Sequence, residues 1–136
     1  MVENRMALQA VDGLRAPAMP QSVHTIMMND QFFQLVAGAI HIHSLETRRL
    51  ESLNTTLQLA STIAVESPLP ARAVRVLLEG VELSGPTKLH MIVRDRWYPT
   101  FKAAWNHYSE AAGRTLLVKE CVYLLLVQFV VHDSYR

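Results

Sequence analysis

The sequence predicts an all-α protein, a single compact bundle of about five or six helices with short connections. Three observations support this fold class. Half of the 136 residues are hydrophobic, which is enough to bury the core of one domain. Only five glycines and six prolines interrupt the chain, so long segments run without a break. Within those segments apolar residues recur at steps of three and four, the period of an amphipathic helix.

Residues 1–20 are expected to be a flexible N-terminal segment, followed by a single helical domain at 21–136. The segment has no apolar run of the length found in secretory signals. The most apolar window of the chain, residues 122–131, is shorter than the roughly 20 residues that a membrane span needs. Because the single cysteine, Cys121, cannot form a disulfide within the chain, a reducing compartment is indicated. We therefore expect a cytoplasmic protein without a membrane span.

Two helices are expected after the N-terminal segment. Asn29 and Asp30 can cap a helix through QFFQLVAGAIHIH, although the alternating apolar residues of 35–43 leave a strand open there. Ser44 is then the expected N-cap of a helix over residues 45–65, whose apolar stripe follows the helical period. The prolines of ESPLPAR end this second helix.

Four further helices are expected, each bounded by a residue that suits a helix end. Pro70 fits the first turn of one, Thr115 can cap the last, and Gly113 fits the C-cap of the helix between them. These four helices cover residues 71–81, 88–97, 101–111 and 116–131.

The last of these helices is apolar nearly all round, so one partner helix cannot cover it. It is either the central helix of the domain or part of a subunit interface, and the sequence leaves both open. From the second arrangement we predict a homo-oligomer. The expected interface residues are Leu124, Leu126, Val127 and Val130.

The stretch GVELSGPTKL lies between two predicted helices, as the turn of a helix-turn-helix would. Residues 70–119 hold eight basic and four acidic residues, a local charge of +4. Specific DNA readers commonly neutralise about 6–10 phosphates, and Glu82 and Asp95 interrupt the basic face. We therefore expect mainly a turn, with DNA binding as the alternative. In that alternative the contacts come from Arg72, Arg75, Lys88, His90 and Arg94.

The stretch RDRWYPTFKAAWNHY combines arginine with aromatic residues, the types that dominate the hot spots of protein interfaces. Phe101 and Trp105 recur at helical spacing and are expected in the core. Contacts with a partner protein are expected at Arg94, Arg96, Trp97, Tyr98 and Lys102.

No catalytic motif is present in the sequence, so we expect no enzyme and no cofactor. His41 and His43 could chelate a metal from a strand, but on a helix they point apart, and no metal site is expected. The predicted function is a small helical protein–protein interaction module, an adaptor, chaperone-like or regulatory protein that forms homo-oligomers. The alternative is a DNA-binding transcriptional regulator with a helix-turn-helix at residues 71–97.

Overall fold

The computed structural model describes residues 22–134, which form a mostly helical fold with a small two-stranded antiparallel sheet. The predicted flexible segment, residues 1–20, lies outside this range. The all-α prediction is correct for the helices and wrong for the sheet. The elements in chain order are β2 (Ser22–Met28), α1 (Asp30–Thr47), α2 (Leu53–Glu66), α3 (Ala71–Leu78), β3 (Thr87–Val93), α4 (Tyr98–Ala112) and α5 (Val118–Ser134).

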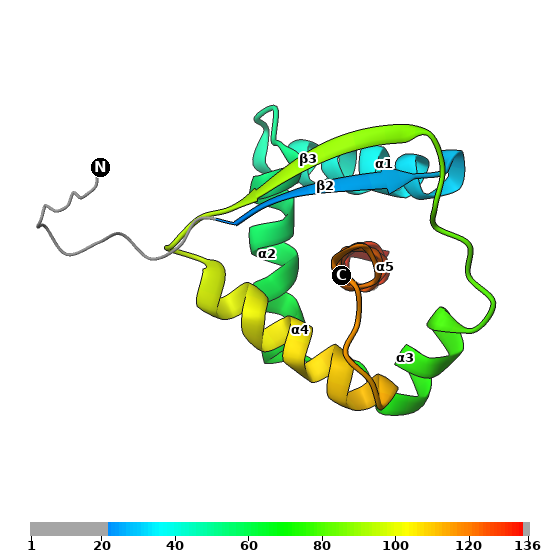
Figure 1. The fold of residues 1–136 in the computed structure, drawn as a ribbon. Coiled ribbons are helices and arrows are strands. Elements are labelled where there is room, and N and C mark those ends of the chain that lie inside the picture. The colour runs from blue at the N-terminus through cyan, green and yellow to red at the C-terminus, as the bar shows by residue number, and fades with distance from the viewer. Residues whose placement is uncertain (1–21, 135–136) are drawn as a thin grey trace, which may run out of the picture.

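Helix α5 runs through the middle of the fold. Figure 1 looks along its axis and shows the sheet on one side and the other four helices around it. Leu124 and Leu126 are completely buried among these elements, and Val127 and Val130 are half-buried. A helix that is apolar all round suits this position because each of its faces meets another element. The predicted subunit interface is therefore wrong for Leu124 and Leu126, which a second chain cannot reach.

Residues 35–43, for which the sequence left both a helix and a strand open, are helical and belong to α1. The Asn29 side chain caps this helix as predicted, because its Oδ1 accepts a hydrogen bond of 2.9 Å from the backbone N–H of Phe32. The helix buries Phe32, Val36, Ala39 and His43 against the core.

The second helix begins later than predicted, at Leu53. Ser52 is its N-cap, and together with Thr55 it forms a capping box in which each side chain binds the backbone N–H of the other residue. Ser44, the predicted cap, lies inside α1. Its hydroxyl instead accepts a hydrogen bond of 2.9 Å from the backbone N–H of Glu51, across the turn between the helices.

Strand β3 replaces the helix predicted at residues 88–97. Its side chains alternate, with Met91 and Val93 buried and with Lys88 and His90 exposed. The spacing of the apolar residues in this segment fits a helix almost as well as it fits a strand. Pairing with β2, which lies about 65 residues earlier, makes the strand the stable choice.

The stretch GVELSGPTKL joins α3 to β3 and not one helix to another. The main chain there is held against the start of α1. Asn29 donates from its backbone N–H to the Leu83 carbonyl at 2.8 Å and from its side chain to the Glu82 carbonyl at 2.7 Å. A Cβ on Gly85 would lie 2.3 Å from the Cα of Asn29, so this approach requires glycine. The alternative of a helix-turn-helix is wrong, because the residues of its second helix form β3, and the expected turn between two packed helices is wrong for the same reason.

The remaining helices occur close to their predicted positions. Helix α3 follows Pro70 as expected but ends at Leu78, three residues early, and α4 starts at Tyr98, three residues early. Gly113 caps α4 in the left-handed conformation, with φ of 78°, which confirms its predicted role.

Candidate functional site

The two-stranded sheet has one covered edge and one open edge. On the outer edge of β3, the backbone N–H of Ile92 donates to Asn54 Oδ1 of α2 at 3.2 Å. This N–H therefore points away from β2. Backbone groups in an antiparallel pair alternate in direction, so Val23, Thr25 and Met27 of β2 direct their N–H and C=O groups away from β3. Within residues 22–134, no second strand pairs with that side of β2.

The open edge of β2 has none of the usual features that prevent strand pairing. Soluble proteins protect such edges with lysine, proline, bulges or a covering element, because unpaired strand groups accept another strand. The sequence SVHTIMM contains no lysine, arginine, acidic residue or proline, and its seven residues pair with β3 without a bulge. By contrast, β3 carries Lys88 and is capped by Asn54. The edge of β2 is therefore the less protected of the two edges of the sheet.

The side chains of β2 divide between core and solvent. Ile26 and Met28 point inward and are buried, whereas Val23 is 60% exposed and Met27 is 39% exposed. Thr25 lies between these two on the exposed face, where its hydroxyl is 3.1 Å from Nδ1 of His90. The exposed face therefore offers apolar side chains on both sides of a small polar centre.

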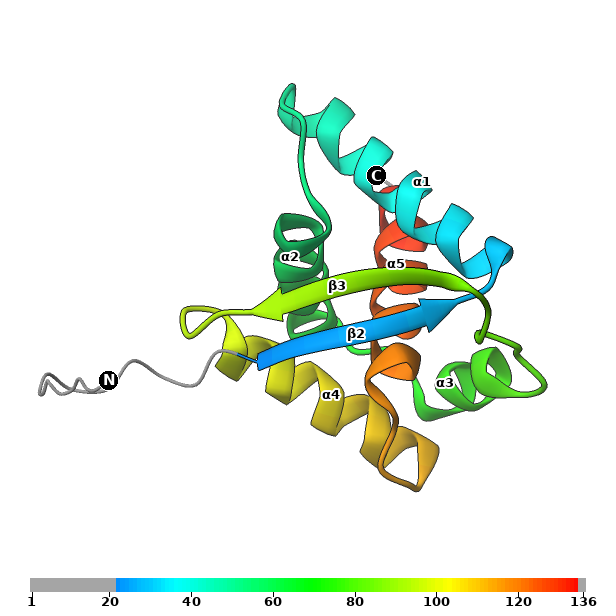
Figure 2. The same cartoon turned by 45° about the horizontal axis from the view of Figure 1, so that its top comes forward.

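A groove of about 410 Å³ follows the open edge, between residues 23–27 of β2 and residues 117–119 at the start of α5. Figure 2 shows β2 at the front of the sheet, above the start of α5. Leu117 contributes an apolar side chain that is 59% exposed. Lys119 directs its ammonium to the hydroxyl of Ser84 at 2.5 Å. The groove is therefore mainly apolar.

The position of Leu117 is fixed by the carboxylate of Glu120. This carboxylate accepts a hydrogen bond of 2.9 Å from the backbone N–H of Leu117 and a bidentate pair, of 2.9 and 2.7 Å, from Arg114. The bond from Arg114 lowers the pKa of Glu120 below its ordinary value, and the backbone bond acts in the same direction. The start of α5 is thereby held in place beside β2.

Of the five residues predicted to bind a partner, one is buried and four lie in the turn between β3 and α4 or at the start of α4. Trp97 is only 5% exposed and packs edge-on against Phe101 in the core, so its predicted role as a surface contact is wrong. Tyr98 is half-buried at the start of α4, and Lys102 is exposed, with its ammonium 5.7 Å from the centre of the Trp105 ring. Arg94 and Arg96 are exposed in the turn between β3 and α4.

The core assignment of the other two aromatic residues is correct for Phe101 and only partly correct for Trp105. Phe101 is completely buried. Trp105 is half-buried, and its indole N–H donates to the carbonyl of Leu116 at 2.9 Å. This bond connects α4 to the segment that leads into α5.

The residues proposed to contact DNA are spread over different elements. Arg72 and Arg75 lie on α3, and Lys88 and His90 lie on the exposed face of the sheet. Figure 2 shows α3 near the end of the sheet where β3 begins, whereas Arg94 follows the opposite end. A strand of this length spans roughly 20 Å, so Arg94 lies well apart from Arg72 and Arg75.

The open edge of β2 was missed by sequence analysis, which assigned no element to residues 22–28. The sequence SVHTIMM carries only a weak strand signal, because its polar and apolar residues do not alternate; the alternation of outward and inward side chains at residues 23–28 is seen only in the structure. No protein-family model, characterised protein or solved structure matches the chain. Among the described residues, no helix is long and apolar enough to cross a bilayer. The fold and this edge together define a mostly helical protein with an open strand.

Proposed function

We propose that this chain is a self-associating protein–protein interaction module, in which β2 pairs with β2 of a second copy. The observation that supports this function is the uncharged, unprotected edge of β2. Its backbone groups at Val23, Thr25 and Met27 have no partner strand within the described part of the chain. A protein that exposes such an edge commonly associates through it.

The edge of β2 is complementary to itself. Antiparallel pairing of two identical strands has a two-fold axis, which gives a closed dimer. With the axis at Thr25, this residue faces Thr25 of the second copy, and Val23 faces Met27 of the second copy. These are the residues whose backbone groups point outward, so each of these pairs can exchange two N–H···O=C hydrogen bonds. The result is one continuous four-stranded sheet.

The side chains favour the same register. On the exposed face, Val23 and Met27 of the two copies form apolar cross-strand pairs, which contribute stability in antiparallel sheets. The exposed Leu117 side chains approach the new seam from beneath, where the groove runs along β2. The strand itself brings no like charges together, because β2 carries no Lys, Arg, Asp or Glu, and the Lys119 ammonium in the groove is directed to the Ser84 hydroxyl. Association therefore covers apolar surface without burying an unpaired charge.

Sedimentation velocity over a series of micromolar concentrations tests this function, with Thr25→Pro as the test variant. Proline removes an N–H that β2 does not use in pairing with β3, and it blocks pairing on the outer side. We expect the wild-type chain to sediment as a dimer and Thr25→Pro as a monomer with an unchanged far-ultraviolet circular dichroism spectrum.

His90→Pro is the matched control. His90 faces Thr25 in the same sheet, and its N–H points outward from the other edge. Both substitutions remove the contact between the Thr25 hydroxyl and the His90 ring, so they differ mainly in the edge that they block. We expect His90→Pro to remain dimeric. A monomeric wild-type chain, or a dimer that persists in Thr25→Pro, would show that β2 is not the interface.

A further inference from the structure

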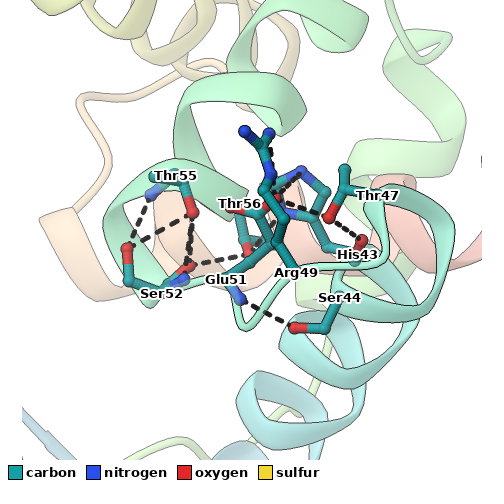
Figure 3. Close-up of polar contacts among 8 residues, drawn as sticks. All are labelled: His43, Ser44, Thr47, Arg49, Glu51, Ser52, Thr55 and Thr56. Atoms are coloured by element: carbon teal, nitrogen blue, oxygen red, sulfur yellow. Dashed lines mark hydrogen bonds and ion pairs between the residues drawn. The ribbon is translucent and has the colours of Figure 1, made fainter.

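The turn between α1 and α2 and the adjoining side of α2 border an open polar pocket, on a different part of the molecule from the edge of β2. The pocket has a volume of about 330 Å³. It is lined by His43, Arg49, Glu51, Thr55, Gln58, Leu59 and Thr62. Figure 3 shows the polar side chains of the turn converging on Glu51 and His43. The left-handed conformation of Arg48, with φ of 59°, reverses the chain so that these two residues meet.

Hydrogen bonds fix which nitrogen of His43 carries a proton. The hydroxyl of Thr56 lies 2.8 Å from the carbonyl of Ser52, to which it can only donate. The same hydroxyl lies 2.9 Å from His43 Nδ1 and must therefore accept there. We accordingly assign the proton to Nδ1. In the neutral ring this leaves Nε2, which faces the pocket, as an acceptor.

The carboxylate of Glu51 is the second acceptor in the pocket. The Thr47 hydroxyl donates to Oε2 at 2.6 Å, and this bond is the main reason why the pKa of Glu51 lies below its ordinary value. The Glu51 side chain is only 7% exposed, as is that of His43. The nearest cation, Arg49, makes a loose contact of 3.4 Å from a side chain that is 75% exposed. Glu51 is therefore an ionised carboxylate with little exposed surface and a weakly held counter-ion.

The distance between the two acceptors indicates what the pocket can bind. His43 Nε2 and Glu51 Oε2 are 4.0 Å apart, which is too long for a hydrogen bond between them. One donor group can reach both atoms, and a cation is favoured because the carboxylate is charged. Among the described residues, no three metal-binding side chains gather, so a metal ion would lack ligands. An ammonium group has several N–H donors and meets both requirements.

We propose that this pocket binds a primary ammonium group, held between Nε2 of His43 and Oε2 of Glu51. The side chains of Thr55, Gln58 and Thr62 lie along one side of α2 and provide uncharged polar contacts for the rest of the ligand. The volume lies at the lower end of the range for small-molecule sites, so the ligand is a small amine or the end of a lysine side chain.

Titration with methylammonium chloride, followed by NMR of the His43 ring, tests this site. Tetramethylammonium chloride is the control ligand, because it has the same charge but no N–H donor. We expect saturable shifts with methylammonium and none with tetramethylammonium. Equal shifts with both salts, or no saturable shift with methylammonium, would overturn the proposal. Nα-acetyl-lysine methylamide, which has a free side-chain amine, then distinguishes a small free amine from a lysine side chain of another protein. It binds only if a lysine side chain carried on a peptide backbone can enter the pocket.

Substitutions separate binding at Glu51 from a general effect of charge. Glu51→Gln keeps the shape and removes the charge, and it should weaken methylammonium binding by about tenfold or more. Glu66→Gln removes the same charge at the exposed end of α2 and should leave binding unchanged. Arg49→Ala removes the resident counter-ion and should strengthen binding. Equal affinities in wild type and Glu51→Gln would refute the assigned contacts, provided that both proteins have the same circular dichroism spectrum.

Discussion

Tyr108→Phe tests how a buried polar network holds α4 and α5 to the end of α2, where Ser67 is the C-cap. The Tyr108 hydroxyl donates to Oε1 of Gln128 at 2.6 Å, and Nε2 of Gln128 donates to the Ser67 carbonyl at 2.6 Å. Tyr108 is completely buried, and Gln128 is nearly so. Removing the hydroxyl leaves Oε1 of Gln128 without a donor in a place that water reaches poorly. The expected cost is about 1–3 kcal/mol in the free energy of unfolding.

For a domain of this size, 1 kcal/mol changes Tm by roughly 4 °C, so we expect a decrease of about 4–12 °C. Differential scanning calorimetry measures it. Tyr123→Phe is the matched control, because it removes the same atom from a half-buried residue whose bond to the Leu77 carbonyl is longer, 3.3 Å. The double variant Tyr108→Phe with Gln128→Leu replaces both partners by apolar groups. It should be less destabilised than the sum of its two single substitutions.

The same tyrosine predicts a loss of stability at alkaline pH. Burial raises the pKa of Tyr108 far above its ordinary value, because the phenolate would lose its hydration in the core. The unfolded chain therefore releases this proton first, at a pH of about 10. The stabilisation is complete below that pH and is lost as the pH rises above it. Per pH unit, the loss from this residue approaches about 1.4 kcal/mol.

Tyr108→Phe should remove that part of the alkaline slope, while the contributions of Cys121 and Tyr123, whose pKa values burial also raises, remain. Urea unfolding at a series of pH values above the ordinary pKa of tyrosine measures the slope. An alkaline slope that is unchanged in Tyr108→Phe would refute the buried-donor reasoning. So would a loss of stability at neutral pH no larger than that of Tyr123→Phe.

Two further predictions concern the centre of the fold and a close approach of the main chain. Leu126→Asp should prevent folding of the monomer itself, because it places a charge in the completely buried centre of α5; a folded protein by circular dichroism would contradict this placement. Gly85→Ala should lower Tm markedly, because its Cβ would lie 2.3 Å from the Cα of Asn29. Gly38→Ala, where a Cβ meets nothing within 4 Å, is the control and should leave Tm unchanged or raise it.

The open edge of β2 and the ammonium pocket depend on neighbours that the sequence does not reveal. An edge is open only if nothing else lies beside it, and that depends on the position of every other element. His43 and Glu51 are eight residues apart and meet only because the chain reverses at Arg48. The sequence did predict that His43 belongs to no metal site, and that remains a prediction. That the chain forms an oligomer also remains a prediction, and the interface that we now propose for it is the open edge of β2.

The sequence by itself determined most of the helices, because a helix is stabilised by contacts between residues three and four apart and by its own end residues. The cap at Asn29, the start after Pro70 and the stop at Gly113 are all local, and each lies where the sequence predicted it. Only the tertiary structure decided that residues 87–93 are a strand, because their hydrogen bonds go to β2, the first element of the described chain, about 65 residues earlier. It also decided that α5 is central, since an apolar helix can be covered equally well by its own chain or by another.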